Sequence, residues 1–305
     1  MSYLSFSDRL AEQIERKKSV VCVGIDPRAA SLPPSLQPSP HASLGEVAEA
    51  YRVFSREVID VVAPLVPIIK PQAAFFEQLG PAGMKVLGEV IEHAVNLGLL
   101  VIVDGKRNDI GSTAEAYAAA YLGSGTKSAW GSDALTVSPY LGDDSLDPFV
   151  AQCDRANAGI FVLVKTSNPG SGWLQDRPTD GTTITEHVAD LVQQLNQPRL
   201  GACGYGPVGA VVGATYPLEL GELRARMPSA WILIPGFGAQ GGDAGDVRGG
   251  FDDRGLGAIV NSSRHILFAH ARQEYAALFS PGHWQRAVER ATLEMNDQLN
   301  AVRFT

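Results

Sequence analysis

Short apolar runs of four to six residues alternate along the chain with longer stretches in which apolar residues recur every three or four positions. Successive apolar residues over such short runs, rich in Val and Ile, are typical of parallel strands buried on both faces. The pattern predicts eight strands, at Val20–Ile25, Pro67–Lys70, Leu99–Asp104, Ala134–Ser138, Ile160–Lys165, Val208–Gly213, Trp231–Pro235 and Ala258–Asn261.

The longer stretches between these runs have the period of amphipathic helices. They predict helices at Leu44–Val62, Gly83–Leu97, Ser112–Leu122, Leu146–Arg155, Thr183–Leu195, Pro217–Arg226, Gly242–Gly249 and Trp284–Asn300. Eight strand–helix units in 305 residues predict an α/β fold, the (β/α)₈ TIM barrel, as a single domain over residues 1–305. The alternative is a doubly wound open sheet, although no GxGxxG motif follows the first strand.

Two long loops are rich in turn-forming residues. We interpret the Pro/Ser-rich segment Ser31–Ser43 as a loop between the first strand and its helix rather than as a domain boundary. The segment Ser167–Thr182 follows the fifth strand and is either a lid over a site or an ordinary surface loop.

The stretch Leu99–Thr113, LLVIVDGKRNDIGST, carries the strongest chemical signal. An apolar strand runs directly into Asp104, Lys106 and Asp109, and the first two project from the same side if the strand continues. Charged groups at the end of a buried strand are costly unless they are paired. The alternatives are an active site at the carboxyl ends of the strands and a solvated loop with an incidental ion pair.

Other strands end in polar residues as well. Asp26 follows the first strand, where an Asp before proline is also a common turn former, and Lys70 ends the second. Neutral hydrogen-bonding groups that fit a polar ring or a turn follow the fourth and fifth strands, at Ser138, Thr166, Ser167 and Asn168.

A glycine-rich segment, PGFGAQGGD, follows the seventh strand, and SSR follows the eighth. In barrels, these two loops often bind phosphate through backbone N–H groups and a helix N-terminus. Gly238, Gln240, Gly241 and Gly242 allow a close approach to an anion, and Arg264 offers a planar fork for its oxygens. The pattern therefore predicts a phosphorylated small-molecule substrate.

The composition, with 45% hydrophobic and 19% charged residues, is that of an ordinary globular protein. A net charge of −8 disfavours nucleic acid or an anionic membrane as the main partner. Three widely separated cysteines and the lack of a signal-peptide or membrane-spanning apolar run favour a cytoplasmic protein. The six histidines have no metal-ligand spacing, so we expect no metal.

Taken together, the IIKPQ, DGKRND and PGFGAQGG segments resemble the orotidine 5′-phosphate decarboxylase family, in the layout of its longer bacterial subfamily. The resemblance extends over nearly the whole chain. The DxKxxD signature of that family is intact as Asp104, Lys106 and Asp109, and its other lysine is matched by Lys70. In that family, these four groups form a charged network around the carboxylate that leaves.

The resemblance implies cofactor-independent decarboxylation of orotidine 5′-phosphate in pyrimidine biosynthesis, with Lys106 protonating C6 and Asp104 orienting it. It also implies a homodimer with shared active sites, in which Asp109 acts across the interface with Ile110 and Thr113 beside it. The implied substrate contacts are Asp26 to the ribose, Ser167 to the pyrimidine, and Arg264, Gln240 and Gly241 to the phosphate.

Two other functions are compatible with such a barrel. One is a related decarboxylase or aldolase that acts on a sugar phosphate with Mg²⁺, but Lys70 stands near the place where those relatives have a metal-binding acid. The other is a non-catalytic protein that binds a phosphorylated ligand, which leaves the Lys/Asp array without a purpose. Magnesium dependence tests the first alternative, and turnover tests the second.

Overall fold

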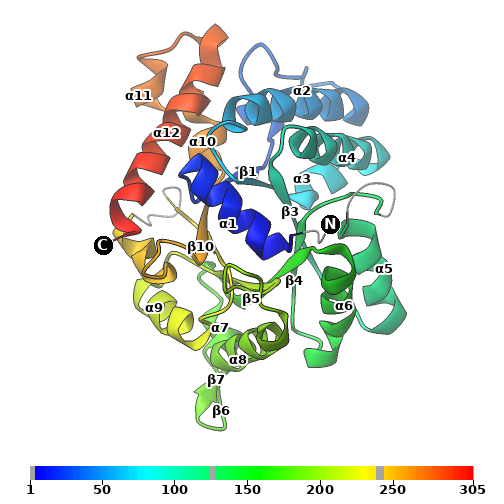
Figure 1. The fold of residues 1–305 in the computed structure, drawn as a ribbon. Helices are drawn as coiled ribbons and strands as arrows, with labels where there is room; N and C mark the ends of the chain where they lie inside the picture. The colour runs from blue at the N-terminus through cyan, green and yellow to red at the C-terminus, as the bar shows by residue number, and fades with distance from the viewer. Residues whose placement is uncertain (1–3, 124–127, 238–243, 305) are drawn as a thin grey trace.

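The computed structural model describes residues 4–123, 128–237 and 244–304. Within these residues, eight parallel strands close into a barrel in the order β1-β10-β9-β8-β5-β4-β3-β2 (Figure 1). The barrel strands are β1 Val21–Ile25, β2 Ile68–Pro71, β3 Leu100–Arg107, β4 Ala134–Val137, β5 Gly159–Lys165, β8 Val208–Val212, β9 Ile232–Pro235 and β10 Ala258–Ser262. The predicted TIM barrel is confirmed, and the open sheet is excluded.

The barrel strands are continuous apolar runs because both faces of the sheet are covered. Nearly every one of their side chains is buried, whichever face of the sheet it lies on. Their boundaries differ from the predicted ones by one or two residues, with one exception. β3 continues three residues beyond Asp104, to Arg107, so the charged segment itself is part of the strand.

Helices surround the barrel (Figure 1). The long ones that follow strands are α2 Leu44–Val62, α4 Gly80–Asn96, α5 Gly111–Tyr121, α6 Asp147–Ala156, α8 Ile184–Asn196, α9 Pro217–Arg226 and α12 Trp284–Val302. Shorter elements, which the sequence did not predict, lie in the connections: α3 Ala73–Glu77, α7 Gly172–Gln175, α10 Arg264–Leu267, α11 Gln273–Ala276 and the hairpin β6 Pro178–Thr179 with β7 Thr182–Thr183.

The predicted helix Gly242–Gly249 is wrong. Its described part forms a 3₁₀ segment, Gly245–Gly250, and residues 242–243 lie outside the described structure. Glycine costs a helix interior about 1 kcal/mol relative to alanine, and the local sequence GGDAGDVRGG is too rich in it to continue an α-helix.

The first helix, α1 Phe6–Lys17, lies across the amino-terminal end of the barrel. The ring of Phe6 packs edge-on against Phe161, with 6.0 Å between centroids. Gly159, which begins β5, makes room for it, because a Cβ there would lie 2.4 Å from the ring of Phe6. With this end covered, the carboxyl ends of the strands are left to form a site. In the described part of the chain, no helix combines the length and apolar character needed to cross a bilayer.

Candidate active site

The end of β3 departs from regular strand geometry where the charged residues begin. The pairing of β3 with β4 shifts register between Val103 and Arg107, and Lys106 has a positive φ of 44°. The Arg107 guanidinium donates to the carbonyl of Gly105 at 2.9 Å. The backbone amide of Lys106 donates to Oγ1 of Thr136 at 2.9 Å. These contacts hold the chain in a conformation that a residue with a side chain rarely adopts.

Asp104 lies between the ammonium groups of Lys70 and Lys106. Nζ of Lys70 is 2.7 Å from one carboxylate oxygen, and Nζ of Lys106 is 2.6 Å from the other. Lys70 and Asp104 are buried, whereas 47% of the Lys106 side chain is exposed. The structure thus brings together three of the four predicted catalytic residues and leaves the Lys106 ammonium accessible to a ligand.

Mutual pairing keeps the two buried members of this array, Lys70 and Asp104, ionised. Burial alone raises the pKa of Asp104, but Lys70 and Lys106 outweigh it and hold that pKa well below its usual value. Burial alone lowers the pKa of Lys70, but Asp104 and Asp26 outweigh it and raise that pKa. The Lys70 ammonium and the Asp104 carboxylate therefore stay charged in a buried place, where fixed charges act most strongly on a ligand.

Thr136, in β4, was not predicted as a site residue. Its hydroxyl donates to Oδ1 of Asp104 at 2.9 Å and accepts the Lys106 amide. It is buried, and it connects the carboxylate to the strained backbone of the lysine. The sequence predicts the next hydroxyl instead, Ser138, whose Oγ accepts a hydrogen bond of 3.4 Å from the Tyr140 amide. Alternation along the strand does not separate Thr136 from Ser138, since residues two positions apart project from the same face. The distinguishing signal is that Thr136 is a polar residue inside the apolar run of β4, whereas Ser138 follows the end of the strand.

Asp26 lies directly after β1, beside Lys70. Its Oδ1 atom is buried with no hydrogen-bond partner among the described residues. Burial raises the pKa of Asp26, and this effect outweighs Lys70 and a hydrogen bond with Ser263, which lower it. Ser263 can approach because Gly24 has no side chain, since a Cβ there would lie 1.9 Å from Oγ of Ser263. A buried acceptor without a donor is suited to a ligand hydroxyl.

The remaining predicted residues are spread around the same end of the barrel. Asp109 accepts a hydrogen bond from the Ile110 amide at 2.9 Å, and among the described residues it forms no ion pair. Ile110 and Thr113, at the start of α5, are exposed. Arg264 is exposed at the first position of α10, and Ser167 is half-buried just after β5. Gln240 and Gly241 lie outside the described residues.

No group of three or more His, Cys, Asp or Glu side chains in the described ranges is arranged to hold a metal ion. The charged side chains that converge at β2 and β3 consist of an acid held by two lysines. Ammonium groups compete with a cation for the same carboxylate oxygens, so this donor set fits an anionic ligand better than a metal.

A sequence model of the family described as "Orotidine 5'-phosphate decarboxylase / HUMPS family" matches residues 19–278. The chain belongs to this family. The matched range includes every barrel strand, and with them Lys70, Asp104 and Lys106. The predicted family resemblance is confirmed.

Individual members of the family match over nearly their full length. A protein of Rhodopirellula baltica named "Orotidine 5'-phosphate decarboxylase" is 62% identical over 299 residues, covering 97% of this chain and 99% of the relative. A protein of the same name from Deinococcus radiodurans is 41% identical over 302 residues, 98% of each chain. The match to such relatives agrees with the layout of the longer bacterial type.

Solved structures of the family have the same barrel. The crystal structure of a putative orotidine 5'-phosphate decarboxylase from Streptomyces avermitilis superposes with a TM-score of 0.82 at 35% identity and covers 100% of this chain and 98% of its own. The structure of Leishmania donovani OMP decarboxylase gives a TM-score of 0.77 at 33% identity, covering 99% and 100%.

Proposed function

We propose that this chain is a carboxy-lyase that converts orotidine 5′-phosphate to uridine 5′-phosphate and CO₂ in de novo pyrimidine biosynthesis. The observation that carries the proposal is the array in which Asp104 lies 2.7 Å from Lys70 and 2.6 Å from Lys106. Membership of the decarboxylase family supports the same reaction. The proposal assigns no cofactor and no metal.

In this reaction, the bond between C6 and the carboxylate carbon breaks, and its electron pair stays on C6 as CO₂ leaves. A proton from the Lys106 ammonium then forms the new C6–H bond, and the amine regains a proton from solvent. At an effective dielectric near 20, unit charges about 4 Å apart interact by roughly 4 kcal/mol. The accessible ammonium of Lys106 can therefore stabilise the carbanion before protonating it.

Asp104 and Lys70 prepare Lys106 for this role. Asp104 accepts a hydrogen bond from the Lys106 ammonium and directs it. In the proposed complex, the Asp104 charge lies close to the departing carboxylate. Lys70 pairs with the other carboxylate oxygen, so Asp104 remains ionised despite its burial. Because these charges are set before the substrate arrives, little reorganisation opposes the reaction.

The rest of the substrate is assigned to the surrounding strand ends. The unpaired, buried Oδ1 of Asp26 is suited to a ribose hydroxyl, and Ser167 to the pyrimidine. Arg264, with Gln240 and Gly241, is assigned to the phosphate. Binding energy from this remote group can support catalysis at C6.

We further propose a homodimer in which Asp109 completes the partner's site, with Ile110 and Thr113 beside it. The support is that Asp109 has no ion pair among the described residues of its own chain, while Ile110 is 57% exposed. The dimer acts on a small nucleotide and needs neither nucleic acid nor membrane. We place this single-domain enzyme in the cytoplasm, in keeping with free thiols at Cys22, Cys153 and Cys203.

The test is turnover without added metal. Purified, EDTA-treated protein is incubated with orotidine 5′-phosphate, and the loss of the orotate-type ultraviolet absorbance is followed. We expect uridine 5′-phosphate as the product. No loss of absorbance, with activity appearing only on addition of Mg²⁺ and a sugar phosphate, would overturn the proposal.

A further inference from the structure

A second charged cluster lies at the carboxyl end of β5, and the proposed reaction does not use it. Its centre is Lys165, the last residue of the strand, whose side chain is completely buried at 0% exposure. A buried ammonium is costly, because removing a charge from water takes several kcal/mol that only good partners restore. Lys165 stands two residues before Ser167, the residue assigned to the pyrimidine.

The partners of Lys165 come from two different connections. Its ammonium pairs with Asp176, at the end of α7, and with Oε2 of Glu219, at 3.2 Å, in the first turn of α9. It also lies 4.6 Å from the ring centroid of Tyr216. Burial lowers the pKa of Lys165, but the hydrogen bonds to Asp176 and Glu219 raise it above its usual value, so the group stays charged.

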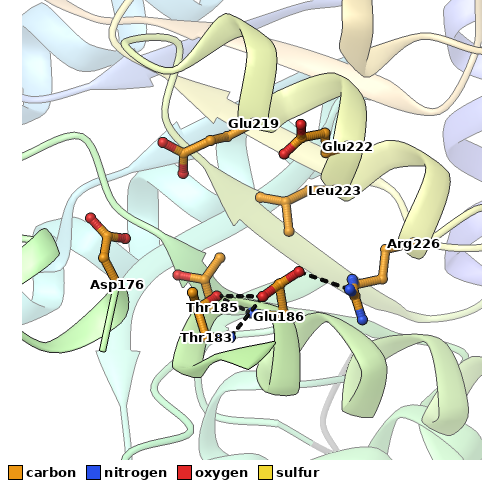
Figure 2. A pocket seen from close by; sticks show the side chains of 8 residues that line it. All are labelled: Asp176, Thr183, Thr185, Glu186, Glu219, Glu222, Leu223 and Arg226. Atoms are coloured by element: carbon orange, nitrogen blue, oxygen red, sulfur yellow. Dashed lines mark hydrogen bonds and ion pairs between the residues drawn. The ribbon is translucent and has the colours of Figure 1, made fainter. Parts of the chain in front are cut away.

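Both acidic partners also line a surface cavity of about 600 Å³ between the β5–α8 connection, α8 and α9. Figure 2 shows Asp176 entering from the connection and Glu219 from α9, with Glu186 and Arg226 paired on the other side. Asp176 and Glu219 are 52% and 42% exposed. Through these two ion pairs, the buried lysine links the β5–α8 connection to α9.

Further hydrogen bonds tie the same connection to the strand end. The Thr166 amide donates to Oε1 of Gln175 at 3.0 Å, and Nε2 of Gln175 donates to the Thr166 hydroxyl at 2.8 Å. The carbonyl of Lys165 accepts from the Gly213 amide at 2.9 Å. A Cβ on Gly213 would lie 2.8 Å from Cβ of Ser167, so the two chains are in close contact there. Ser167 is therefore held on two sides, by the hydrogen bonds between Thr166 and Gln175 and by the close contact with Gly213.

We infer that Lys165 is a positioning residue, which fastens the β5–α8 connection to the start of α9 and thereby sets Ser167 for contact with the pyrimidine ring of the nucleotide. This inference rests on the proposed function. Lys165→Met removes the one fully buried charge of the cluster, and the carboxylates that it leaves, Asp176 and Glu219, are 52% and 42% exposed and can be solvated by water, so a methionine can replace Lys165 in the fold. A charge held by partners from two connections specifies one relative geometry, which a methionine does not.

The test compares Lys165→Met with Lys165→Arg and with a matched control, Lys85→Met. Lys85 is 79% exposed and pairs loosely with Glu89, 3.6 Å away in α4. We expect Lys165→Met to raise the KM for orotidine 5′-phosphate roughly tenfold, the equivalent of one lost hydrogen bond. Because that contact is made with substrate and transition state alike, kcat changes little. We expect Lys165→Arg to have a KM between those of Lys165→Met and the wild type, and Lys85→Met to have the wild-type KM and kcat.

Ser167→Ala and the double variant Lys165→Met/Ser167→Ala show whether the lysine acts through the serine. We expect Ser167→Ala to raise KM by itself and the double variant to be no worse than the more impaired single variant. Impairment by Ser167→Ala together with a normal KM for Lys165→Met overturns the inference and leaves the proposed function standing. If Ser167→Ala leaves the KM unchanged, both the inference about Lys165 and the role of Ser167 are overturned. Inactive wild-type protein overturns the proposed function itself.

If Lys165→Met does not fold, the half-exposed partners provide the test. The double variant Asp176→Asn/Glu219→Gln removes both counter-charges and leaves the lysine in place, and limited proteolysis between residues 166 and 183 reports on the connection. A raised KM with faster cleavage supports the inference. An unchanged KM in this variant contradicts it.

Discussion

At the scale of single residues, the site depends on groups that stabilise charge in a buried place. Asp104 accepts hydrogen bonds from Lys70, Lys106 and Thr136. Such a network is stable only while each member keeps its partners, because an unpaired buried charge costs several kcal/mol. Substitutions that leave the charged groups paired should therefore change catalysis without unfolding the chain.

Thr136→Val should lower kcat about 10- to 100-fold, because it removes a hydrogen bond to a charged group worth roughly 1.5–3 kcal/mol. It also leaves the Lys106 amide without its acceptor. Steady-state kinetics measure the effect, and Thr136→Ser should recover most of the rate.

The matched control is Thr292→Val. Thr292 is equally buried, but its hydroxyl donates to the Val288 carbonyl within α12, away from the site. This variant should keep the wild-type kcat. If Thr136→Val has the same kcat as this control, the hydroxyl has no part in positioning the charged pair.

Asp26→Asn should make the free protein more stable near neutral pH while weakening substrate binding. The folded-state pKa of Asp26 is raised above 3.8, so the ionised carboxyl destabilises the fold once the pH exceeds that folded-state value. Removing the charge should raise the free energy of unfolding by on the order of 1 kcal/mol, because groups kept for function commonly reduce stability.

Thermal denaturation of Asp26→Asn and wild-type protein between pH 7 and pH 4 measures this effect. The Tm advantage of the variant should shrink as the pH falls toward 3.8, because the wild-type carboxyl then binds its proton. A lower Tm for the variant at pH 7 would show instead that attraction to Lys70 outweighs the burial of Asp26.

At the scale of elements, local sequence signals set most boundaries, and glycines decide how closely the elements pack. The helix predicted at Leu44–Val62 has those bounds, since Ser43 and Glu46 form a reciprocal capping box at its start. The strand end at Lys106 was not predictable in detail. Its positive φ is maintained by Thr136 and by the Arg107 side chain, not by a turn-forming residue.

Gly209→Ala should destabilise the barrel by about 1–3 kcal/mol, the usual cost of overpacking. In β8, a Cβ at this position would lie 2.6 Å from the Phe161 ring and 2.8 Å from the Trp231 carbonyl oxygen. Urea denaturation measures the change. The control is Gly221→Ala in α9, where a Cβ meets nothing within 4 Å and where we expect a gain of about 0.5–1 kcal/mol. Equal stabilities for the two variants would contradict close packing at Gly209.

At the scale of the whole molecule, barrel closure brings the strand ends together and the proposed dimer completes them. β2 pairs with β3, with Ile69 opposite Val101 and a further bridge between Gln72 and Asp104. This pairing places Lys70 beside Asp104 although 34 positions separate them. In the proposed dimer, Asp109 acts on the partner's site.

Mixing inactive Lys106→Ala and Asp109→Ala subunits should therefore restore activity. In a mixed dimer with sites shared across the interface, one site carries both substitutions and the other carries neither. Random exchange makes half of the dimers mixed, so the mixture should recover about a quarter of the wild-type rate. Each variant exchanged with itself is the control. No recovery, despite subunit exchange seen by native mass spectrometry, would place Asp109 in its own chain's site.

The sequence by itself determined the eight strands, most of the helices, the family and the DxKxxD signature. Period, capping residues and motif spacing are local properties of a chain. The tertiary structure decided what depends on residues far apart: the Lys70–Asp104 contact, the hydroxyl of Thr136 on two site residues, and the fully buried charge of Lys165. Pattern alone does not assign these, because which strands are neighbours and which charges lose water are settled only when the barrel closes.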